Sequence, residues 1–204
     1  MNEKLKVYLI KINYEIQKNT LKEFLNISIV NHCMKYKLCR KQYDSLYAFY
    51  MLRKIYLNEF NIDINNFKLK ENEYGKPYFD NLYFNISNSM NYIAIAISKK
   101  EVGIDIEFLF NIKEKKEYER FILTKKELAE FSLLEDKRKY LLTKWCQKES
   151  YFKFKGTGID FQSLKINIKK KGLFKYLNLN NDLACIYIYC KYNLNDFVID
   201  LNYN

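Results

Sequence analysis

The segment Gly103-Ile104-Asp105-Ile106-Glu107 places two acidic residues two positions apart. In a β-strand such residues share a face, so Asp105 and Glu107 project together on the side opposite to the two isoleucines. Neighbouring carboxylates repel each other unless a positive group lies between them, and Mg²⁺ is the cation that hard oxygen ligands suit best. The pattern indicates a magnesium site, although an ordinary amphipathic strand with a solvated acidic face shows the same alternation.

A second group of polar residues recurs at helical spacing. Trp145, Glu149 and Lys153 are successive i,i+4 neighbours, so they share one face of a helix. A carboxylate and an ammonium beside the only Trp predict a partly buried polar site. There Glu149 would complete a three-carboxylate metal site, and Lys153 would neutralise phosphate or assist proton transfer. The alternative is a Glu–Lys pair on a helix surface, worth about 0.2–0.5 kcal/mol, and spacing alone favours it.

The third group lies in Phe84-Asn85-Ile86-Ser87-Asn88-Ser89. Hydroxyls, amides and exposed backbone N–H groups ahead of a strand predict a phosphate-binding loop. A plain turn has a similar composition and is the commoner structure.

The elements that would position these groups mix strands and helices. Apolar spacing predicts a buried helix over Ser45–Phe60 and a second long helix over Tyr140–Phe154 that ends at Gly156. We expect Val102–Glu107 to be the hairpin partner of the strand Tyr92–Ser98. The other expected elements are a turn at Tyr74–Tyr78, a capping box at Thr124–Glu127 and strands at Lys4–Ile12, Leu164–Lys169, Leu173–Leu177, Leu183–Tyr192 and Phe197–Leu201. Together they predict the α+β class.

Length and composition limit the possible classes of protein. The chain has 204 residues, enough for one ordinary domain or two small ones, and its 49% hydrophobic content excludes intrinsic disorder. No apolar run approaches the ~20 residues that span a bilayer, and the N-terminus lacks the apolar stretch of a signal peptide. We therefore expect a soluble, cytoplasmic protein whose five cysteines are free thiols.

The net charge of +11 predicts an anionic partner: nucleic acid, an anionic membrane, a phosphate-rich small molecule or an acidic protein. The basic residues are dispersed along the chain, which argues against a single DNA-binding arm. The only histidine, His32, lies outside any ligand cluster, and we do not expect it to be catalytic.

Four motifs together resemble the 4′-phosphopantetheinyl transferases in order and spacing, in particular the longer, Sfp-type members in which one chain holds two similar halves. They are Gly75-Lys76-Pro77, the Phe84–Ser89 segment, the Gly103–Glu107 segment and Trp145-Cys146-Gln147-Lys148-Glu149-Ser150-Tyr151-Phe152-Lys153. The series W-x-x-K-E-S-x-x-K after G-I-D-I-E is much more specific than any single motif. The resemblance implies two α+β halves related by a pseudo-two-fold: residues 1–101 on the adenine and 3′-phosphate side of coenzyme A, and residues 102–204 with the metal and catalytic groups.

The reaction implied by the resemblance is Mg²⁺-dependent transfer of 4′-phosphopantetheine from coenzyme A to a serine of an apo carrier protein, which releases 3′,5′-ADP. Asp105, Glu107 and Glu149 match the metal ligands, and Lys153 matches a lysine that contacts the phosphates. Glu149 also matches the residue proposed to take the proton from the serine. A metal-bound water is the alternative base, because a carboxylate that binds a cation is a poor base.

The resemblance also assigns the coenzyme-binding residues. Lys76 and Pro77 match the pair near the adenine, and Ser87 and Asn88 fall in the loop that meets the 3′-phosphate. Glu127 matches an acidic position of the second half, although a role restricted to the capping box is equally consistent with its place in the sequence.

Two positions depart from the family pattern. Asn88 stands where most relatives have histidine, which replaces a group that can be cationic by a neutral amide donor. An alignment anchored on Arg53 puts Asp44 where an arginine usually binds the 3′-phosphate. Either Arg40 or Lys41 takes over that role, or coenzyme A binds weakly. The three metal-binding positions are intact, which favours an active enzyme.

The resemblance further implies an acidic acyl or peptidyl carrier protein as partner, which suits the positive charge. It implies a monomer, with no nucleic-acid or membrane partner. Two alternatives remain: a non-catalytic module that binds a carrier protein or coenzyme A, and a basic nucleic-acid-binding domain. The charge and the 17% aromatic content suggest the latter, but no RRM, KH or zinc-finger signature appears.

Overall fold

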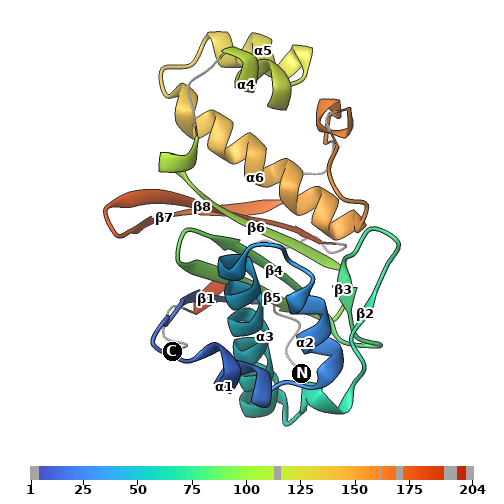
Figure 1. Cartoon of the computed structure of the whole chain (residues 1–204). Helices are drawn as coiled ribbons and strands as arrows, with labels where there is room; N and C mark the ends of the chain where they lie inside the picture. The colour runs from blue at the N-terminus through green and yellow to red at the C-terminus, as the bar shows by residue number, and fades with distance from the viewer. Residues whose placement is uncertain (1–4, 113–115, 161, 169–171, 191–196, 201–204) are drawn as a thin grey trace.

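The computed structural model describes residues 5–112, 116–160, 162–168, 172–190 and 197–200. Its helices and strands are mixed, so the α+β class is confirmed (Figure 1). The strands are β1 Lys6–Lys11, β2 Lys70–Glu71, β3 Pro77–Tyr78, β4 Tyr83–Ser89, β5 Tyr92–Ser98, β6 Val102–Phe108, β7 Leu173–Leu179, β8 Asp182–Cys190 and β9 Val198–Asp200. The α-helices are α1 Lys18–Glu23, α2 Ile27–Met34, α3 Cys39–Phe60, α4 Lys116–Ile122, α5 Lys125–Ser132 and α6 Lys137–Lys155, and the 3₁₀-helices are Ile64–Asn66, Leu109–Asn111 and Ser163–Lys165.

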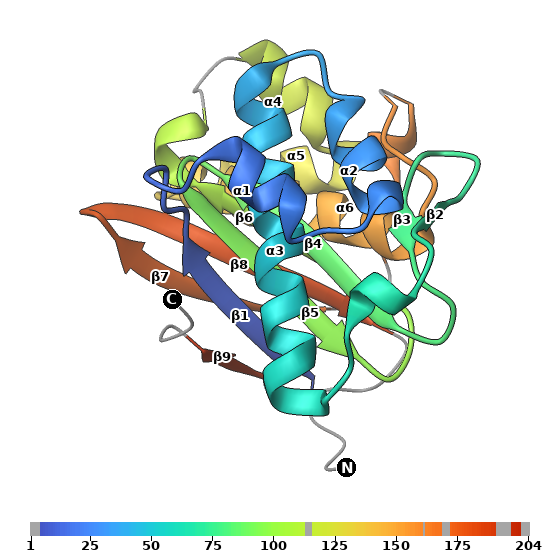
Figure 2. The same ribbon diagram turned by 60° about the horizontal axis from the view of Figure 1, so that its bottom comes forward.

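The main elements form four layers, with two sheets packed face to face between α3 and α6 (Figures 1 and 2). Alternation along the strands produces this arrangement, because successive side chains point to opposite faces. In β1, for example, Tyr8 and Ile10 pack in the core beneath α3, whereas Val7 and Leu9 pack in the core between the sheets. A third core lies between the second sheet and the helices α4, α5 and α6.

The first sheet has the strand order β4-β5-β1-β9. The helix expected over Ser45–Phe60 is confirmed as α3, which begins earlier, at Cys39. The expectation of a loop at Phe84–Ser89 is wrong, because this segment forms β4 and pairs with β5 along its whole length. Its polar residues suggest a turn only when the neighbouring elements are unknown.

The second sheet has the order β6-β8-β7. The expected strand at Val102–Glu107 is confirmed as β6, but the hairpin with Tyr92–Ser98 is wrong, because β6 pairs with β8. Both edges of β5 are already taken, one by β1 and the other by β4. The strand expected over Leu164–Lys169 is also wrong, since Ser163–Lys165 is a 3₁₀-helix and Lys169 lies outside the described residues.

The two sheets share one connectivity. In the first, β1 is followed by α3 and then by the hairpin β4–β5, whose second strand pairs antiparallel with β1. In the second, β6 is followed by α6 and then by the hairpin β7–β8, whose second strand pairs antiparallel with β6. The last strand, β9, returns to the first sheet and pairs parallel with β1.

Helix ends follow the sequence signals. The capping box expected at Thr124–Glu127 is confirmed at the start of α5, where the Glu127 backbone N–H donates to the Thr124 hydroxyl and the Glu127 carboxylate accepts from the Thr124 N–H. The helix α6 ends at Gly156, whose φ of 71° is in the left-handed region that favours glycine.

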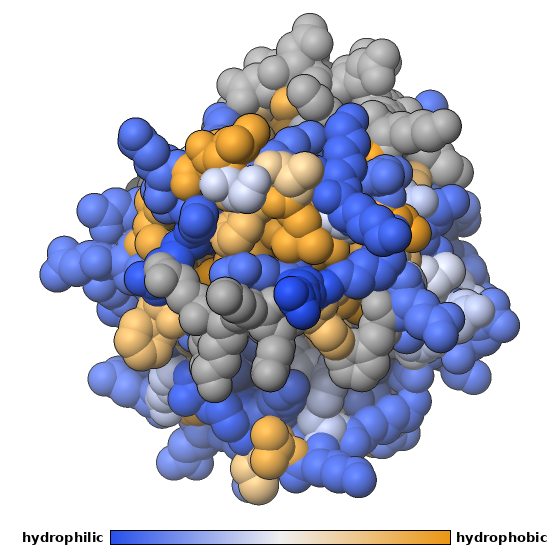
Figure 3. All heavy atoms as spheres, turned by 90° about the horizontal axis from the view of Figure 1, so that it is seen from above, coloured by the Kyte–Doolittle hydropathy of each residue, from blue (hydrophilic) through white to orange (hydrophobic). Residues whose placement is uncertain are grey.

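Three further features relate to the expectations from composition: the polarity of the surface, the state of the cysteines and the apolar length of the helices. Seen from above, at the end where α4 and α5 lie, hydrophilic side chains surround a few gathered apolar ones (Figure 3). All five cysteines are free thiols, as expected. Within the described ranges, no helix is long and apolar enough to cross a membrane.

Candidate active site

A compact polar cluster joins β4, β6 and α6. The Lys153 Nζ lies 2.7 Å from Asp105 Oδ1 and 2.8 Å from the Ser87 Oγ, and the Ser87 hydroxyl donates to the same Asp105 oxygen at 2.8 Å. Ile104 and Ile106 pack into the core between the sheets, so Asp105 faces the helix, as the alternation predicts. Asp105 is only 4% exposed, and its ion pair with Lys153 compensates the cost of burying its charge.

Side chains of β4 replace backbone pairing where β4 meets β6. Asn85 Oδ1 accepts from the Ile104 N–H at 2.8 Å, and Ser87 Oγ accepts from the Ile106 N–H at 3.3 Å. These bonds satisfy backbone donors on the edge of β6 that no strand of its own sheet covers. The polar residues of β4 therefore hold the two sheets in register at the site.

Glu107 lies on the same face of β6 as Asp105, two residues further along. Its Oε1 accepts hydrogen bonds from the Ser89 hydroxyl, from the Phe108 N–H at 2.8 Å and from Asn111 Nδ2 at 2.7 Å. These donors fix the carboxylate in place.

Glu149 is half-buried on α6, one turn before Lys153. Burial raises the pKa of its carboxyl to about 7, and the negative charge of Asp105 adds to this rise. Lys153 opposes the rise, whereas Glu107 contributes to it. For Lys153 itself, burial disfavours the charged form, but the carboxylates of Asp105 and Glu149 outweigh burial and hold its pKa above the usual value.

The three predicted metal ligands thus lie on facing elements, β6 and α6. No three His, Cys, Asp or Glu side chains of the described residues lie close enough together to hold a metal ion as they stand. Two observations nevertheless fit a hard cation. The buried Asp105 Oδ2 has no hydrogen-bond partner in the described part of the chain, and the charges of Asp105 and Glu107 add to the effect of burial in raising the pKa of Glu149. Oxygen donors of this kind suit Mg²⁺.

A cleft of about 420 Å³ opens beside this cluster. It is lined by Glu149 and Lys153 from α6, by Lys76 just before β3, by Pro77 at the start of β3, and by Gly156 at the end of α6. The structure therefore brings together four of the predicted site residues. Lys76 Nζ is 3.3 Å from Glu101 Oε2, which holds its ammonium at the edge of this region.

Asn72 connects the walls of this cleft. Its Nδ2 donates to Gly156 O at 2.7 Å, and its Oδ1 accepts from the Lys76 N–H at 2.9 Å. This side chain joins the turn that precedes β3 to the end of α6, and the sequence analysis did not single it out.

A second, smaller cavity of about 240 Å³ adjoins the cleft, because Pro77, Asn85 and Ile86 line both. Asn88, Lys41 and Asp44 line the smaller cavity only. Ser87 does not line either one; its hydroxyl is buried against Asp105 instead. Ser87 and Asn88 therefore face different parts of the site.

Asp44 is neutralised in place. Arg40 Nε lies 3.2 Å from its Oδ1, one helical turn away, and the Tyr14 hydroxyl donates to the same oxygen at 3.1 Å. Arg40 also lies over the Tyr14 ring at 4.3 Å. Lys41 is exposed beside the cavity, while Arg53 is turned away and pairs with Asp63. Of Arg40 and Lys41, the two candidates from the sequence for binding the 3′-phosphate, it is Lys41 that lines the cavity.

His32 also lines the smaller cavity, and its Nδ1 lies 2.7 Å from Glu71 Oε1. None of the hydrogen bonds and ion pairs of His32 within the described residues is with Asp105, Ser87 or Lys153.

Comparisons with known proteins decide the family. The sequence model of the 4′-phosphopantetheinyl transferase superfamily matches residues 101–201. The chain is 29% identical over 160 residues to the 4′-phosphopantetheinyl transferase gsp of Aneurinibacillus migulanus. That match covers 76% of this chain and 67% of the relative. It is 27% identical over 152 residues to the 4′-phosphopantetheinyl transferase Sfp of Bacillus subtilis. That match covers 68% of this chain and 66% of the relative. A third relative, the L-aminoadipate-semialdehyde dehydrogenase-phosphopantetheinyl transferase of Saccharomyces cerevisiae, is 29% identical over 111 residues, which cover 48% of this chain and 41% of the relative.

The chain belongs to the 4′-phosphopantetheinyl transferase superfamily. The family and the enzyme class expected from the four motifs are therefore confirmed. The matched segments span about two thirds of the first two relatives. Neither the nucleic-acid-binding nor the non-catalytic alternative gains support from these matches.

Gly103 is a site residue of this transferase whose role the sequence analysis missed. A Cβ atom at this position would lie 2.0 Å from Ser150 O and 2.4 Å from the Phe154 N. Glycine therefore lets β6 approach α6 closely enough for Asp105 to meet Lys153. The first glycine of G-I-D-I-E was the signal, but its meaning depends on a helix more than forty residues away in the sequence.

The raised pKa of Glu149 predicts a pH-dependent stability. Its folded pKa, about 7, exceeds the ordinary 4.5. The resulting stabilisation is fully present below pH 4.5 and is lost as the pH rises through 7. In EDTA, the melting temperature of the wild type should therefore fall between pH 5 and 8 by several degrees more than that of Glu149→Gln, since ~1 kcal/mol corresponds to about 2–4 °C in a chain of this size. Added Mg²⁺ at pH 8 should raise the melting temperature of the wild type more than that of Glu149→Gln. If the melting temperatures of the two proteins changed with pH in the same way, Glu149 would not have a raised pKa in the folded protein.

Proposed function

We propose that this transferase moves 4′-phosphopantetheine from coenzyme A to a serine hydroxyl of an apo carrier protein and releases 3′,5′-ADP. The observation that carries the proposal is the cleft in which Glu149 and Lys153 of the second half meet Lys76 and Pro77 of the first. One wall offers the carboxylate of Glu149 and the ammonium of Lys153 for a reacting pyrophosphate, and the other offers a lysine and a proline for the remainder of the coenzyme.

In this reaction the serine oxygen attacks phosphorus, and negative charge builds up on the leaving phosphate. Lys153, held in its charged form by Asp105 and Glu149, is suited to stabilise that charge. The pKa of about 7 suits Glu149 to accept the serine proton near neutral pH while no cation is bound to its carboxylate, because a bound cation would lower that pKa.

We propose that Asp105, Glu107 and Glu149 hold Mg²⁺. When bound, this ion would neutralise the pyrophosphate and stabilise the charge of the leaving group. The support is the Asp105 Oδ2, which has no partner among the described residues, and the raised pKa of Glu149, to which burial and the charges of Asp105 and Glu107 contribute.

The coenzyme is proposed to lie across the two adjoining cavities. Lys76 and Pro77 would contact the adenine, while Asn88 and Lys41 would face the 3′-phosphate in the smaller cavity. Because Arg40 neutralises Asp44, the carboxylate would repel the phosphate less than the sequence suggests. Ser87 would hold Asp105 and Lys153 in place through its hydrogen bonds to them and would not contact the 3′-phosphate.

We also propose that residues 1–101 and 102–204 are related by a pseudo-two-fold, in a monomer that works in the cytoplasm. The support is the shared connectivity of the two sheets, each a strand, a long helix and a hairpin. An acidic carrier protein as acceptor would suit the net charge of +11.

The test is intact-mass spectrometry of an apo acyl carrier protein after incubation with this protein, coenzyme A and Mg²⁺. A phosphopantetheine-sized gain that EDTA prevents would support both the reaction and its metal. A gain that persists in EDTA would contradict the metal, and no gain with fatty-acid or peptidyl carriers would contradict the reaction.

Replacing Asn88 by histidine tests the proposed 3′-phosphate cavity. Asn88→His adds a group that can be cationic beside Lys41, so coenzyme A should bind about 3- to 10-fold more tightly, an effect of about 1 kcal/mol. The affinity for 3′-dephospho-coenzyme A should not change. Calorimetric titration of both ligands measures the difference, and an equal effect on the two would show that Asn88 does not face this phosphate.

A further inference from the structure

A lysine of the α6 motif is fully buried and does not line the cleft. Lys148 precedes Glu149, and the sequence analysis gave it no role. Its side chain is 0% exposed, although lysine is seldom found fully buried without a partner. A buried ammonium is costly unless every donor is satisfied, so its surroundings must compensate.

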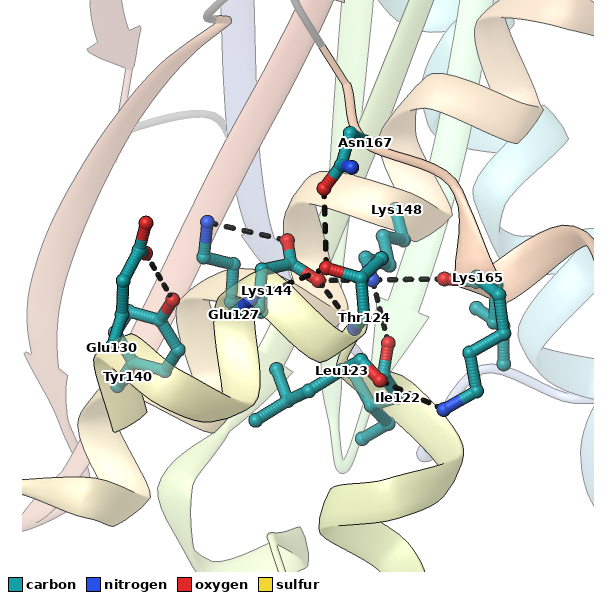
Figure 4. A network of polar contacts seen from close by, with 11 residues as sticks. Ile122, Leu123, Thr124, Glu127, Glu130, Tyr140, Lys144, Lys148, Lys165 and Asn167 are labelled. Carbon is teal, nitrogen blue, oxygen red and sulfur yellow. Dashed lines mark hydrogen bonds and ion pairs between the residues drawn. The ribbon is translucent and has the colours of Figure 1, made fainter. Parts of the chain in front are cut away.

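The compensation comes from three separate segments (Figure 4). Lys148 Nζ donates to Ile122 O at 2.5 Å, to Glu127 Oε2 at 2.7 Å and to Leu164 O at 2.8 Å. An ammonium has three N–H donors, and all are used here. The ion thereby ties α6 to the end of α4, to α5 and to the 3₁₀-helix Ser163–Lys165.

Neighbouring contacts join the same segments. Lys165 Nζ donates to Leu123 O at 2.7 Å, and the Thr124 hydroxyl donates to Asn167 Oδ1 at 3.1 Å (Figure 4). Glu127 makes its capping-box bond with Thr124 and also the ion pair with Lys148, so the capping-box residue of α5 holds the buried ammonium as well. Apart from the capping-box bond, each of these bonds joins two of the same four segments: α6, the end of α4, the start of α5 and the 3₁₀-helix Ser163–Lys165 with the residues just after it. A buried polar network whose donors and acceptors are satisfied in this way favours a single arrangement of the segments that it joins.

The consequence for the site follows from the course of the chain. After Lys148, α6 carries Glu149 and Lys153, and then the chain leaves at Gly156 and passes Gly158 and Ile159, which line the cleft. The 3₁₀-helix that comes next is held by Lys148 itself. Asp160 is fastened to that helix through the bond from its N–H to Ser163 Oγ, at 3.0 Å.

We propose that Lys148 is a positioning residue for the transfer reaction. Paired with Glu127, it fixes the rotation of α6 and the course of the cleft wall after Gly156, so that Glu149 and Lys153 meet Asp105 in the reactive arrangement. This inference rests on the proposed function.

Three variants separate positioning from simple stabilisation. Lys148→Met leaves Glu127 with a buried charge, so we expect a lower melting temperature. Lys148→Met/Glu127→Gln removes both charges while Gln keeps the capping-box oxygen, so we expect much of the stability to return. Lys144→Met is the matched control, because Lys144 pairs with the other oxygen of Glu127, at 3.3 Å, but is partly exposed.

The expected result is a split between stability and turnover. In the double variant, kcat should remain about 10- to 100-fold below that of the wild type, while the KM for coenzyme A changes less than about 3-fold. Lys144→Met should keep wild-type kcat. Recovery of kcat together with the melting temperature would overturn the proposal, since Lys148 would then only stabilise the fold.

A readout without turnover keeps this test separate from the proposed function. If the wild type transfers nothing to carrier proteins, the proposed function fails. Positioning is then decided by amide hydrogen exchange of residues 156–160. Exchange should be faster in the double variant than in the wild type and in Lys144→Met. Equal exchange in all three would overturn the proposal.

Discussion

Asp105→Asn is expected to lower kcat by about 1,000-fold or more while the protein stays folded. Asparagine has the same size and keeps one oxygen, so the contacts with Ser87 and Lys153 can persist. The change removes the negative charge and the second carboxylate oxygen, the buried Oδ2 that has no partner in the described residues. That oxygen is the one available to a cation, so the loss should fall on turnover and not on packing.

The measurement is the initial rate of carrier-protein modification at saturating Mg²⁺ and coenzyme A, together with a circular-dichroism melt. Asp80→Asn is the matched control, because Asp80 is an exposed aspartate whose pair with Lys70 lies outside the site. It should keep the wild-type rate. Retained turnover in Asp105→Asn at saturating Mg²⁺ would remove Asp105 from the proposed metal site.

The local parts of this site could be predicted from the sequence. Alternation in β6 separates Ile104 and Ile106 from Asp105 and Glu107, because a strand has a period of two: one face packs in the core between the sheets and the other faces α6. The i,i+4 spacing of Glu149 and Lys153 likewise places both side chains on one face of α6. These signals need only the geometry of one element.

The contacts between elements could not be predicted in this way. The polar residues of β4 look like a loop, yet Asn85 and Ser87 accept hydrogen bonds from the backbone of β6. Lys148 lies among polar and charged neighbours and looks exposed, yet its three acceptors come from segments that are 16 to 26 residues away. The pairing of β6 with β8 depends on both edges of β5 being occupied, which no local pattern records.

Gly103→Ala is expected to destabilise the protein by about 3 kcal/mol or more, at the upper end of the cost of overpacking a core. The added methyl group would meet backbone atoms of α6, Ser150 O and the Phe154 N, and backbone cannot turn aside as a flexible side chain can. Either α6 moves away from β6 or the sheet bends. Both separate Asp105 from Lys153, so activity should fall even in the fraction that folds.

Gly158→Asn is the control for this substitution. Gly158 has a φ of 66°, which asparagine tolerates better than other residues, and a Cβ there would meet nothing within 4 Å. Its cost should stay below about 1 kcal/mol, because the left-handed conformation costs an ordinary L-residue roughly 1–2 kcal/mol and asparagine less. Urea denaturation of both variants measures the contrast. If Gly103→Ala were as stable as Gly158→Asn, the close approach of β6 to α6 would not be a requirement of the fold, and the glycine of the G-I-D-I-E motif would need another explanation.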